Sequence, residues 1–182
     1  MSEEILVRCC SPTLAGIKTG SLFTLRYDCP GQLAAALRGW NAQLGEKGLR
    51  ALPLRWRDHR ALVYLYRPEM LCRDLNNAQA RALLTRLGYD AGDTALCLRE
   101  LGRRLRRQGE FPHEIGLFLG YPPEDVRGFM RDACGEKCRG CWKVYGDVES
   151  ARRTFARYKK CTDIYCRLYC QGRSLAQLAV AG

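Results

Sequence analysis

The sequence predicts an α+β protein in which a small, mostly antiparallel sheet is covered by helices and the C-terminal half is rich in helix. Two alternating apolar runs around a short polar turn indicate a β-hairpin. The second half of the chain carries one helical pattern after another. Strands and helices do not alternate regularly, which disfavours a doubly wound parallel sheet. With 182 residues the chain has the size of one domain, so we expect residues 1–182 to form a single domain.

The first half of the chain is expected to supply the sheet. The predicted elements are a helix over residues 2–9, a strand over Ser21–Tyr27, a helix over Gln32–Lys47 and a hairpin of Leu49–Trp56 with Ala61–Tyr66 around the turn Arg57–Arg60. The strand is apolar and β-branched. The longer helix carries apolar residues along one face and stops at Gly48, because glycine accepts the left-handed conformation that ends helices.

The second half is expected to be helical, with one short strand. The predicted elements are helices over Asn77–Leu87 and Thr94–Gln108, a helix pair within Phe111–Met130, a strand over Trp142–Tyr145, a long helix over Val148–Cys170 and a last helix over Ser174–Val180. Asp93 and Asp147 precede helices as N-caps, and Gly88, Gly109 and Gly120 follow helices as stops. Helix boundaries are therefore well marked.

Composition narrows the class of protein and of partner. The formal net charge is +11, which favours an acidic partner such as nucleic acid, an anionic small molecule or cofactor, or an acidic protein surface. No apolar run reaches the roughly 20 residues of a membrane helix. The start MSEEILVRCC lacks the basic and apolar regions of a signal peptide. Eleven cysteines, an odd number, then indicate reduced thiols, so we expect a cytoplasmic protein that contacts no membrane.

Four separated motifs carry a resemblance that spans nearly the whole chain. They are PTLAGIKTGSLF at Pro12–Phe23, FPHEIGLFLGYPPEDV at Phe111–Val126, WKVYGD at Trp142–Asp147 and YKKCT at Tyr158–Thr162. The chain resembles a family of small proteins from anaerobic bacteria that is defined only as a domain of unknown function. The resemblance implies no established activity. It implies an aromatic residue at the position of Cys141, so a cysteine function there is not a family property.

A pocket that binds a small anionic ligand is the leading functional hypothesis. Gly16 and Gly20 flank Lys18, and the amides of such a loop can hold an anion, although the spacing is not that of a P-loop. His113 either faces the same pocket or is simply, with Glu114, a residue at a helix start. The residues expected at this site are Cys10, Thr13, Lys18, His113 and Glu114, with Trp142 and Tyr145 as an aromatic wall.

A nucleic-acid or acidic-protein surface is the alternative. The densest basic patch lies on the predicted helix Thr94–Gln108 and contains Arg99, Arg103, Arg106 and Arg107. Such a run is also typical of a solvated helix face. The helix pair within Phe111–Met130 has helix-turn-helix spacing, but Glu124 and Asp125 at the start of its second helix would repel a phosphate backbone.

A metal or redox site on cysteines is the third hypothesis. Cys134, Cys138 and Cys141 form a CxxxCxxC motif, and Cys161 is a possible fourth ligand for zinc or an iron–sulfur cluster. The alternative is that these cysteines pack as small apolar side chains. The HExxH motif is excluded, because Leu117 stands where the second histidine belongs. The sequence leaves open whether the chain is an enzyme, which cofactor it takes and its oligomeric state.

Overall fold

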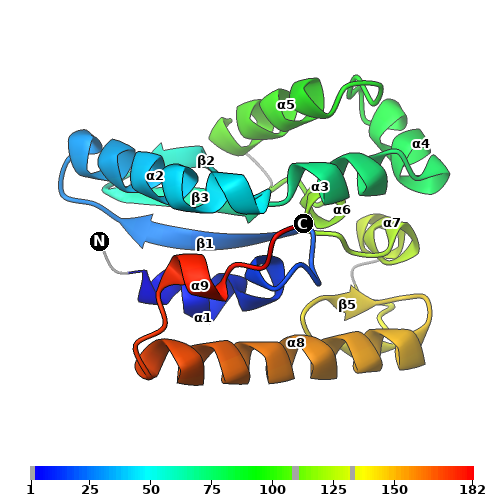
Figure 1. Cartoon of the computed structure of the whole chain (residues 1–182). Helices are drawn as coiled ribbons and strands as arrows, with labels where there is room; N and C mark the ends of the chain where they lie inside the picture. The colour runs from blue at the N-terminus through cyan, green and yellow to red at the C-terminus, as the bar shows by residue number, and fades with distance from the viewer. Residues whose placement is uncertain (1–2, 108–110, 132–133) are drawn as a thin grey trace. The chain divides into compact units, whose positions relative to one another are not determined.

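A computed structural model describes residues 3–107, 111–131 and 134–182. The chain divides into two compact units, which are treated separately below (Figure 1). Unit 1 comprises Met1–Glu69 with Tyr158–Gly182, and unit 2 comprises Met70–Arg157. The expectation of one domain over residues 1–182 stays a prediction.

Unit 1 is built on a three-stranded antiparallel sheet with strand order β1-β3-β2. Its elements are α1 (Glu4–Leu14), β1 (Gly20–Arg26), α2 (Pro30–Leu44), the 3₁₀ helix η1 (Gly45–Lys47), β2 (Arg50–Arg57), β3 (Arg60–Tyr66), the C-terminal part of α8 (Val148–Cys170) and α9 (Leu175–Leu178). Asp58 and His59 connect β2 to β3 with φ values of 49° and 57°. Two positive φ values in a two-residue loop match the right-handed strand twist, so the hairpin is tight.

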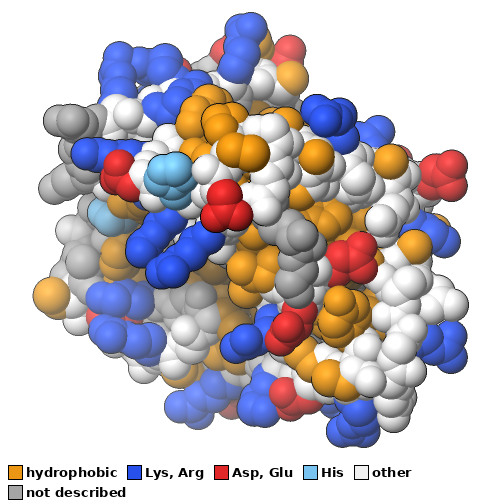
Figure 2. Space-filling model, turned by 90° about the vertical axis from the view of Figure 1, so that its left-hand side faces the viewer, with side chains coloured by type: hydrophobic (Ala, Val, Ile, Leu, Met, Phe, Trp, Pro, Cys, Tyr) orange, Lys and Arg blue, Asp and Glu red, His pale blue; other side chains and the backbone are white. Residues whose placement is uncertain are grey.

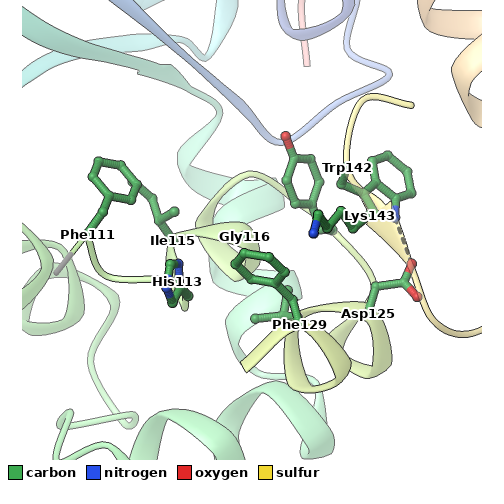
Figure 3. A pocket seen from close by; sticks show the side chains of 10 residues that line it. Phe111, His113, Ile115, Gly116, Asp125, Phe129, Trp142 and Lys143 are labelled. Atoms are coloured by element: carbon green, nitrogen blue, oxygen red, sulfur yellow. Dashed lines mark hydrogen bonds between the residues drawn. The ribbon is translucent and has the colours of Figure 1, made fainter. Parts of the chain in front are cut away.

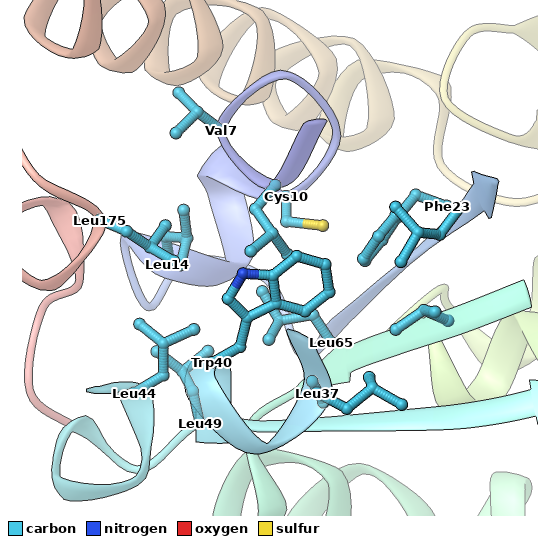
Figure 4. Close-up of a cluster of buried hydrophobic side chains, with 14 of the residues drawn as sticks. Val7, Cys10, Leu14, Phe23, Leu37, Trp40, Leu44, Leu49, Leu65 and Leu175 are labelled. Atoms are coloured by element: carbon cyan, nitrogen blue, oxygen red, sulfur yellow. The ribbon is translucent and has the colours of Figure 1, made fainter. Parts of the chain in front are cut away.

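The core of unit 1 lies between one face of this sheet and its helices (Figure 4). Phe23 from β1 and Leu65 from β3 are buried there, and so are Cys10 from α1 and Trp40 from α2. The rings of Phe23 and Trp40 meet edge to face with centroids 6.1 Å apart. Because successive residues of a strand point to opposite faces, the residues between those of the core form a second face, on which Tyr64 is also buried.

Arg67, directly after β3, ties the ends of unit 1 together. Its side chain is only 3% exposed and donates hydrogen bonds to four backbone carbonyls. The acceptors are Thr13 O at 2.8 Å, Leu14 O at 2.8 Å, Lys47 O at 3.2 Å and Val180 O at 2.7 Å. One guanidinium therefore satisfies the C-terminus of α1, the end of η1 and the last segment of the chain.

Unit 2 is mainly helical and contains one two-stranded antiparallel sheet. Its elements are most of α3 (Pro68–Leu75), then α4 (Ala78–Arg86), α5 (Thr94–Arg106), α6 (Ile115–Phe118), α7 (Pro123–Arg131), β4 (Cys138–Arg139), β5 (Lys143–Val144) and the first part of α8. Asn77 and Asp93 accept hydrogen bonds from the first turns of α4 and α5. Gly120 has a φ of 74° in the turn between α6 and α7, which an L side chain disfavours.

The predicted α+β class is confirmed, and most predicted elements are present. Three differ. The first helix runs on to Leu14, so Pro12–Leu14 belong to α1 and not to a loop. Helix α3 and strand β4 were not predicted as separate elements. The expected end of α5 at Gln108 and Gly109 lies outside the described residues. Within the described ranges, no helix is both long and apolar enough to cross a bilayer.

Candidate functional site

Unit 2 contains an apolar pocket of about 360 Å³ (Figure 3). Its walls come from two segments, the stretch around α6 and α7 and the start of β5. The lining side chains are the aromatic Phe111, Tyr121, Phe129 and Trp142, the small or aliphatic Ile115, Gly116 and Val126, and the polar His113, Asp125 and Lys143. A mostly apolar hollow with a few polar groups is the usual form of a small-molecule site.

Two glycines allow the walls to approach closely. A Cβ on Gly116 would lie 2.7 Å from Val126 Cγ2 and 3.1 Å from Tyr121 Cδ2, so α6 packs against α7 only without a side chain there. A Cβ on Gly128 would lie 2.4 Å from Tyr145 Cγ. The glycines of the FPHEIGLFLGYPPEDVRGFM segment therefore shape the pocket through contact.

Asp125 joins α7 to β5. It is 3% exposed, and its carboxylate accepts three hydrogen bonds, each of 2.7 Å. The donors are Trp142 Nε1 and the backbone amides of Tyr145 and Gly146. Hydrogen bonds to a charged acceptor are about twice as strong as neutral ones. Asp125 thus fixes the indole that forms one wall, as the dashed line in Figure 3 shows.

Trp142 is held on three sides. Its ring stacks on Tyr121 with centroids 4.8 Å apart and planes 27° apart. It also meets Phe155 edge to face at 4.6 Å. Such aromatic pairs stabilise by roughly 0.5–1.5 kcal/mol beyond burial. Together with the bond to Asp125, these contacts make the indole a rigid wall.

The cationic and imidazole groups of the pocket lie beside Phe129. Lys143 Nζ lies 5.4 Å from the centroid of that ring and 3.4 Å from Glu136 Oε2. Arg139 forms an ion pair with the same Glu136, and its hydrogen bond lowers the pKa of that carboxyl group. One carboxylate is therefore shared by two cations. The exposed His113 meets Phe129 edge to face at 4.8 Å.

Two of the predicted site residues, His113 and Trp142, line this pocket. Glu114 does not. It is 4% exposed and accepts from Tyr89 Oη at 2.8 Å and from Arg104 Nη1 at 3.0 Å. Burial, and then the hydrogen bond to Glu114, raise the pKa of Tyr89. The contribution of Tyr145 to the site is its backbone amide, which donates to the pocket residue Asp125.

The remaining predicted pocket residues belong to unit 1. Lys18 Nζ donates to Gly20 O at 2.5 Å and lies 3.4 Å from Ser21 Oγ. Thr13 Oγ1 is buried 2.9 Å from the same Ser21 hydroxyl. Cys10 is fully buried in the core, and burial raises the pKa of its thiol. A cavity shared by Lys18 and residues of unit 2 stays a prediction.

The charge of the predicted basic helix is partly neutralised by Glu100, which lies on the same helix. Arg103 donates to both oxygens of Glu100, at 2.6 Å and 2.5 Å, and these bonds lower the pKa of Glu100 to about 2. The other predicted nucleic-acid residues are exposed: Arg99, Arg106 and Arg107. Lys and Arg side chains are spread over the face seen in Figure 2, with Asp and Glu between them. Binding of nucleic acid by α5 stays a prediction.

None of the eleven cysteines, all of which the structure describes, forms a disulfide. Cys134, Cys138 and Cys141 are in unit 2, and Cys161 is in unit 1. Over residues 3–107, 111–131 and 134–182, no three or more His, Cys, Asp or Glu side chains are grouped so that they could hold a metal ion. The cysteine site stays a prediction.

Sequence reasoning missed Asp125 and Lys143 as pocket residues. Asp125 was interpreted as an acidic residue at a helix start, where the helix dipole favours it and where it would repel a phosphate backbone. Lys143 stands inside the WKVYGD motif, directly after the predicted wall residue Trp142. The available signal was that both lie in the two motif segments that the fold brings together.

Fold and site define an α+β protein with an apolar pocket in its helical unit. The family described as "Protein of unknown function (DUF3793)" matches residues 6–179, and the chain belongs to this family. The predicted membership of a family of unknown function is thereby confirmed. No curated protein and no solved structure matches the chain.

Proposed function

We propose that the pocket of unit 2 binds a small, flat, largely apolar molecule that carries an anionic group. The observation that carries the proposal is the combination of four aromatic rings with a lysine and a histidine around a volume of about 360 Å³. A volume of this size lies in the range of ligand sites, roughly 300–1,000 Å³. The rings supply apolar contact for the body of the ligand.

The expected orientation follows from the polar groups. Asp125 uses its oxygens for three N–H donors of the protein, so its part is to hold the wall. Lys143 and His113 lie on the Phe129 side of the pocket, and the carboxylate nearest Lys143 is already shared with Arg139. The anionic group of the ligand is therefore placed beside Lys143, with the flat body against Trp142 and Tyr121.

A matched pair of fluorescent probes tests this proposal. Anilinonaphthalene sulfonate has an apolar aromatic body with one anionic group, and N-phenylnaphthylamine has nearly the same body without the charge. Fluorescence titration should show that Lys143→Gln weakens the sulfonate about tenfold, the effect of losing one charged hydrogen bond, and leaves the neutral probe unchanged. Phe129→Ala, which removes apolar wall, should weaken both probes.

Lys137→Gln is the matched control, since Lys137 is an exposed lysine of unit 2 that does not line the pocket. It should leave both affinities unchanged. Equal loss of sulfonate binding in Lys137→Gln and Lys143→Gln would show a general charge effect and reject the site. Probe binding that Phe129→Ala does not change would place the probes elsewhere.

A further inference from the structure

The second face of the unit 1 sheet carries a cluster of arginines at its hairpin end. The strand register sets Arg26 of β1, Arg60 of β3 and Arg57 of β2 side by side across the sheet. The next row on the same face consists of Thr24, Leu62 and Arg55. Strands are about 4.8 Å apart and residues about 3.4 Å apart along a strand, so the four arginine side chains start within about 12 Å of one another.

This end of the face is hollowed. The depression, here called the arginine hollow, has a volume of about 550 Å³ and is lined by Thr24, Arg55, Arg57, Asp58, Arg60 and Leu62. All six residues belong to unit 1, and small-molecule sites have volumes of roughly 300–1,000 Å³. The half-buried Leu62 lies on the central strand between Thr24 and Arg55. The hollow therefore has an apolar floor and a rim of hydrogen-bond donors.

The positive charge of the arginine hollow is poorly compensated within the protein. Among the ion pairs of the described residues, one involves its arginines, between Arg57 Nε and Asp58 Oδ2 at 3.3 Å. The two side chains are 72% and 82% exposed, so water screens the pair. Like charges directly opposite one another destabilise a sheet, as Arg60 does beside Arg57 and Arg26. A bound anion would relieve this repulsion.

The donors of the hollow select the chemistry of the anion. Each guanidinium presents five N–H donors in a planar fork that matches the oxygens of a carboxylate or a phosphate. A carboxylate has two acceptor oxygens, too few for three guanidiniums and the Thr24 hydroxyl, whereas a terminal phosphate group alone offers three. None of the six lining residues is aromatic, and Trp56, which pairs with the core residue Ala61, lies on the other face. The hollow thus has no ring on which a nucleobase could stack.

We propose that the arginine hollow binds a small molecule through a diphosphate group. Arg55 and Arg60 donate to the phosphate oxygens, and Arg57 and the Thr24 hydroxyl supply further donors at the rim. A diphosphate concentrates several charged oxygens in a compact group, which suits the closely spaced guanidiniums. The site lies entirely in unit 1, so the proposal does not depend on the unit 2 pocket.

Isothermal titration calorimetry of the full chain with inorganic pyrophosphate tests the proposal. Arg55→Gln/Arg60→Gln should weaken binding about a hundredfold, about tenfold for each charged hydrogen bond lost. Arg55→Lys/Arg60→Lys keeps the charge but not the planar fork, so it should still weaken binding about fivefold. Citrate and orthophosphate should bind about tenfold more weakly than pyrophosphate. ADP should bind as tightly as pyrophosphate, because the lining offers its base no aromatic contact.

Two control variants separate this site from general charge effects and from the other pocket. Arg99→Gln/Arg107→Gln removes the same charge from two exposed arginines of unit 2, and Lys143→Gln alters the pocket of that unit. Both should leave the pyrophosphate affinity unchanged. The thermal midpoint of Arg55→Gln/Arg60→Gln without ligand should be unchanged or raised, which shows that this variant is folded.

Four results would overturn the proposal. The first is absence of pyrophosphate binding at low salt, and the second is an equal loss of affinity in Arg55→Gln/Arg60→Gln and in Arg99→Gln/Arg107→Gln. The third is full affinity in Arg55→Lys/Arg60→Lys, since charge alone would then explain binding. The fourth is tighter binding of citrate, of a short single-stranded oligonucleotide or of phosphatidylserine vesicles than of pyrophosphate.

Discussion

Asp125 is the residue whose replacement should perturb unit 2 most selectively. Asp125→Asn keeps the shape of the side chain and exchanges one oxygen for an NH₂ group. If the remaining oxygen still accepts hydrogen bonds from the amides of Tyr145 and Gly146, these two bonds change from charged to neutral. Each change should lower the free energy of unfolding by about 1 kcal/mol. The NH₂ group then faces Trp142 Nε1, which loses its acceptor at a further cost of about 1–3 kcal/mol. The expected loss is about 4 kcal/mol.

The assay must separate the two units. Urea denaturation gives the loss in free energy of unfolding, and a loss of about 4 kcal/mol is a large part of the 5–15 kcal/mol typical of proteins. Hydrogen exchange measured by mass spectrometry then locates the change. Protection should fall in peptides that cover α7 and β5, and should be retained in peptides of the unit 1 sheet.

Glu124→Gln is the control, because Glu124 is the exposed neighbour of Asp125 on the same helix and loses the same charge. Its effect should be at most about 0.5 kcal/mol. A loss below about 1 kcal/mol for Asp125→Asn, with protection of α7 and β5 unchanged, would refute the view that this carboxylate holds the pocket together.

Two further predictions concern buried and paired charges. Arg67→Met should destabilise unit 1 by about 3–5 kcal/mol in urea denaturation, because four backbone carbonyls lose a charged donor. The control is Arg38→Met, at an exposed position of α2, which should cost under about 0.5 kcal/mol. Equal losses in the two variants would contradict the role assigned to Arg67. The pKa of Glu100 is lowered from 4.5 to about 2, so its folded-state contribution is present above pH 4.5 and disappears as the pH falls towards 2. The thermal midpoint of the unmodified protein should exceed that of Glu100→Gln above pH 5 and approach it near pH 2. A difference between the two midpoints that does not change with pH would count against the pairing of Glu100 with Arg103.

The periodic elements were predictable because their signals are local. The apolar spacing and caps of α2, α4, α5 and α8 are visible in the sequence, and so is the alternation of β2 and β3. Helix α1 was predicted to end at residue 9 and in fact includes Pro12, a residue that disfavours the interior of a helix. Here Pro12 stands near the end of α1, whose carbonyls are satisfied by Arg67, a residue over fifty positions away. Such a contact leaves no periodic pattern in the sequence.

The sequence allowed the segments that form the pocket to be predicted, but not the contacts between their side chains. The motifs Phe111–Val126 and Trp142–Asp147 were singled out, and the fold joins them into one site. What the motifs do not contain is the pairing of Asp125 with the indole of Trp142, because it spans 17 positions of the chain. Strand β4 is only two residues long, so it offers no alternation that a sequence pattern could reveal.

The proposed preference of the pocket for an anionic ligand is supported by the hydrogen bonds that the buried acidic residues of unit 2 already make. Two buried acidic residues lie in the pocket segments, and both accept hydrogen bonds from the protein itself: Glu114 from Tyr89 and Arg104, and Asp125 from Trp142 and two backbone amides. A cationic ligand would have to compete with these donors for oxygens that are nearly buried, at the cost of leaving the donors without acceptors. An anionic ligand meets Lys143 and His113 and displaces none of these bonds. We therefore expect the proposed site to prefer an anionic ligand to a cationic one.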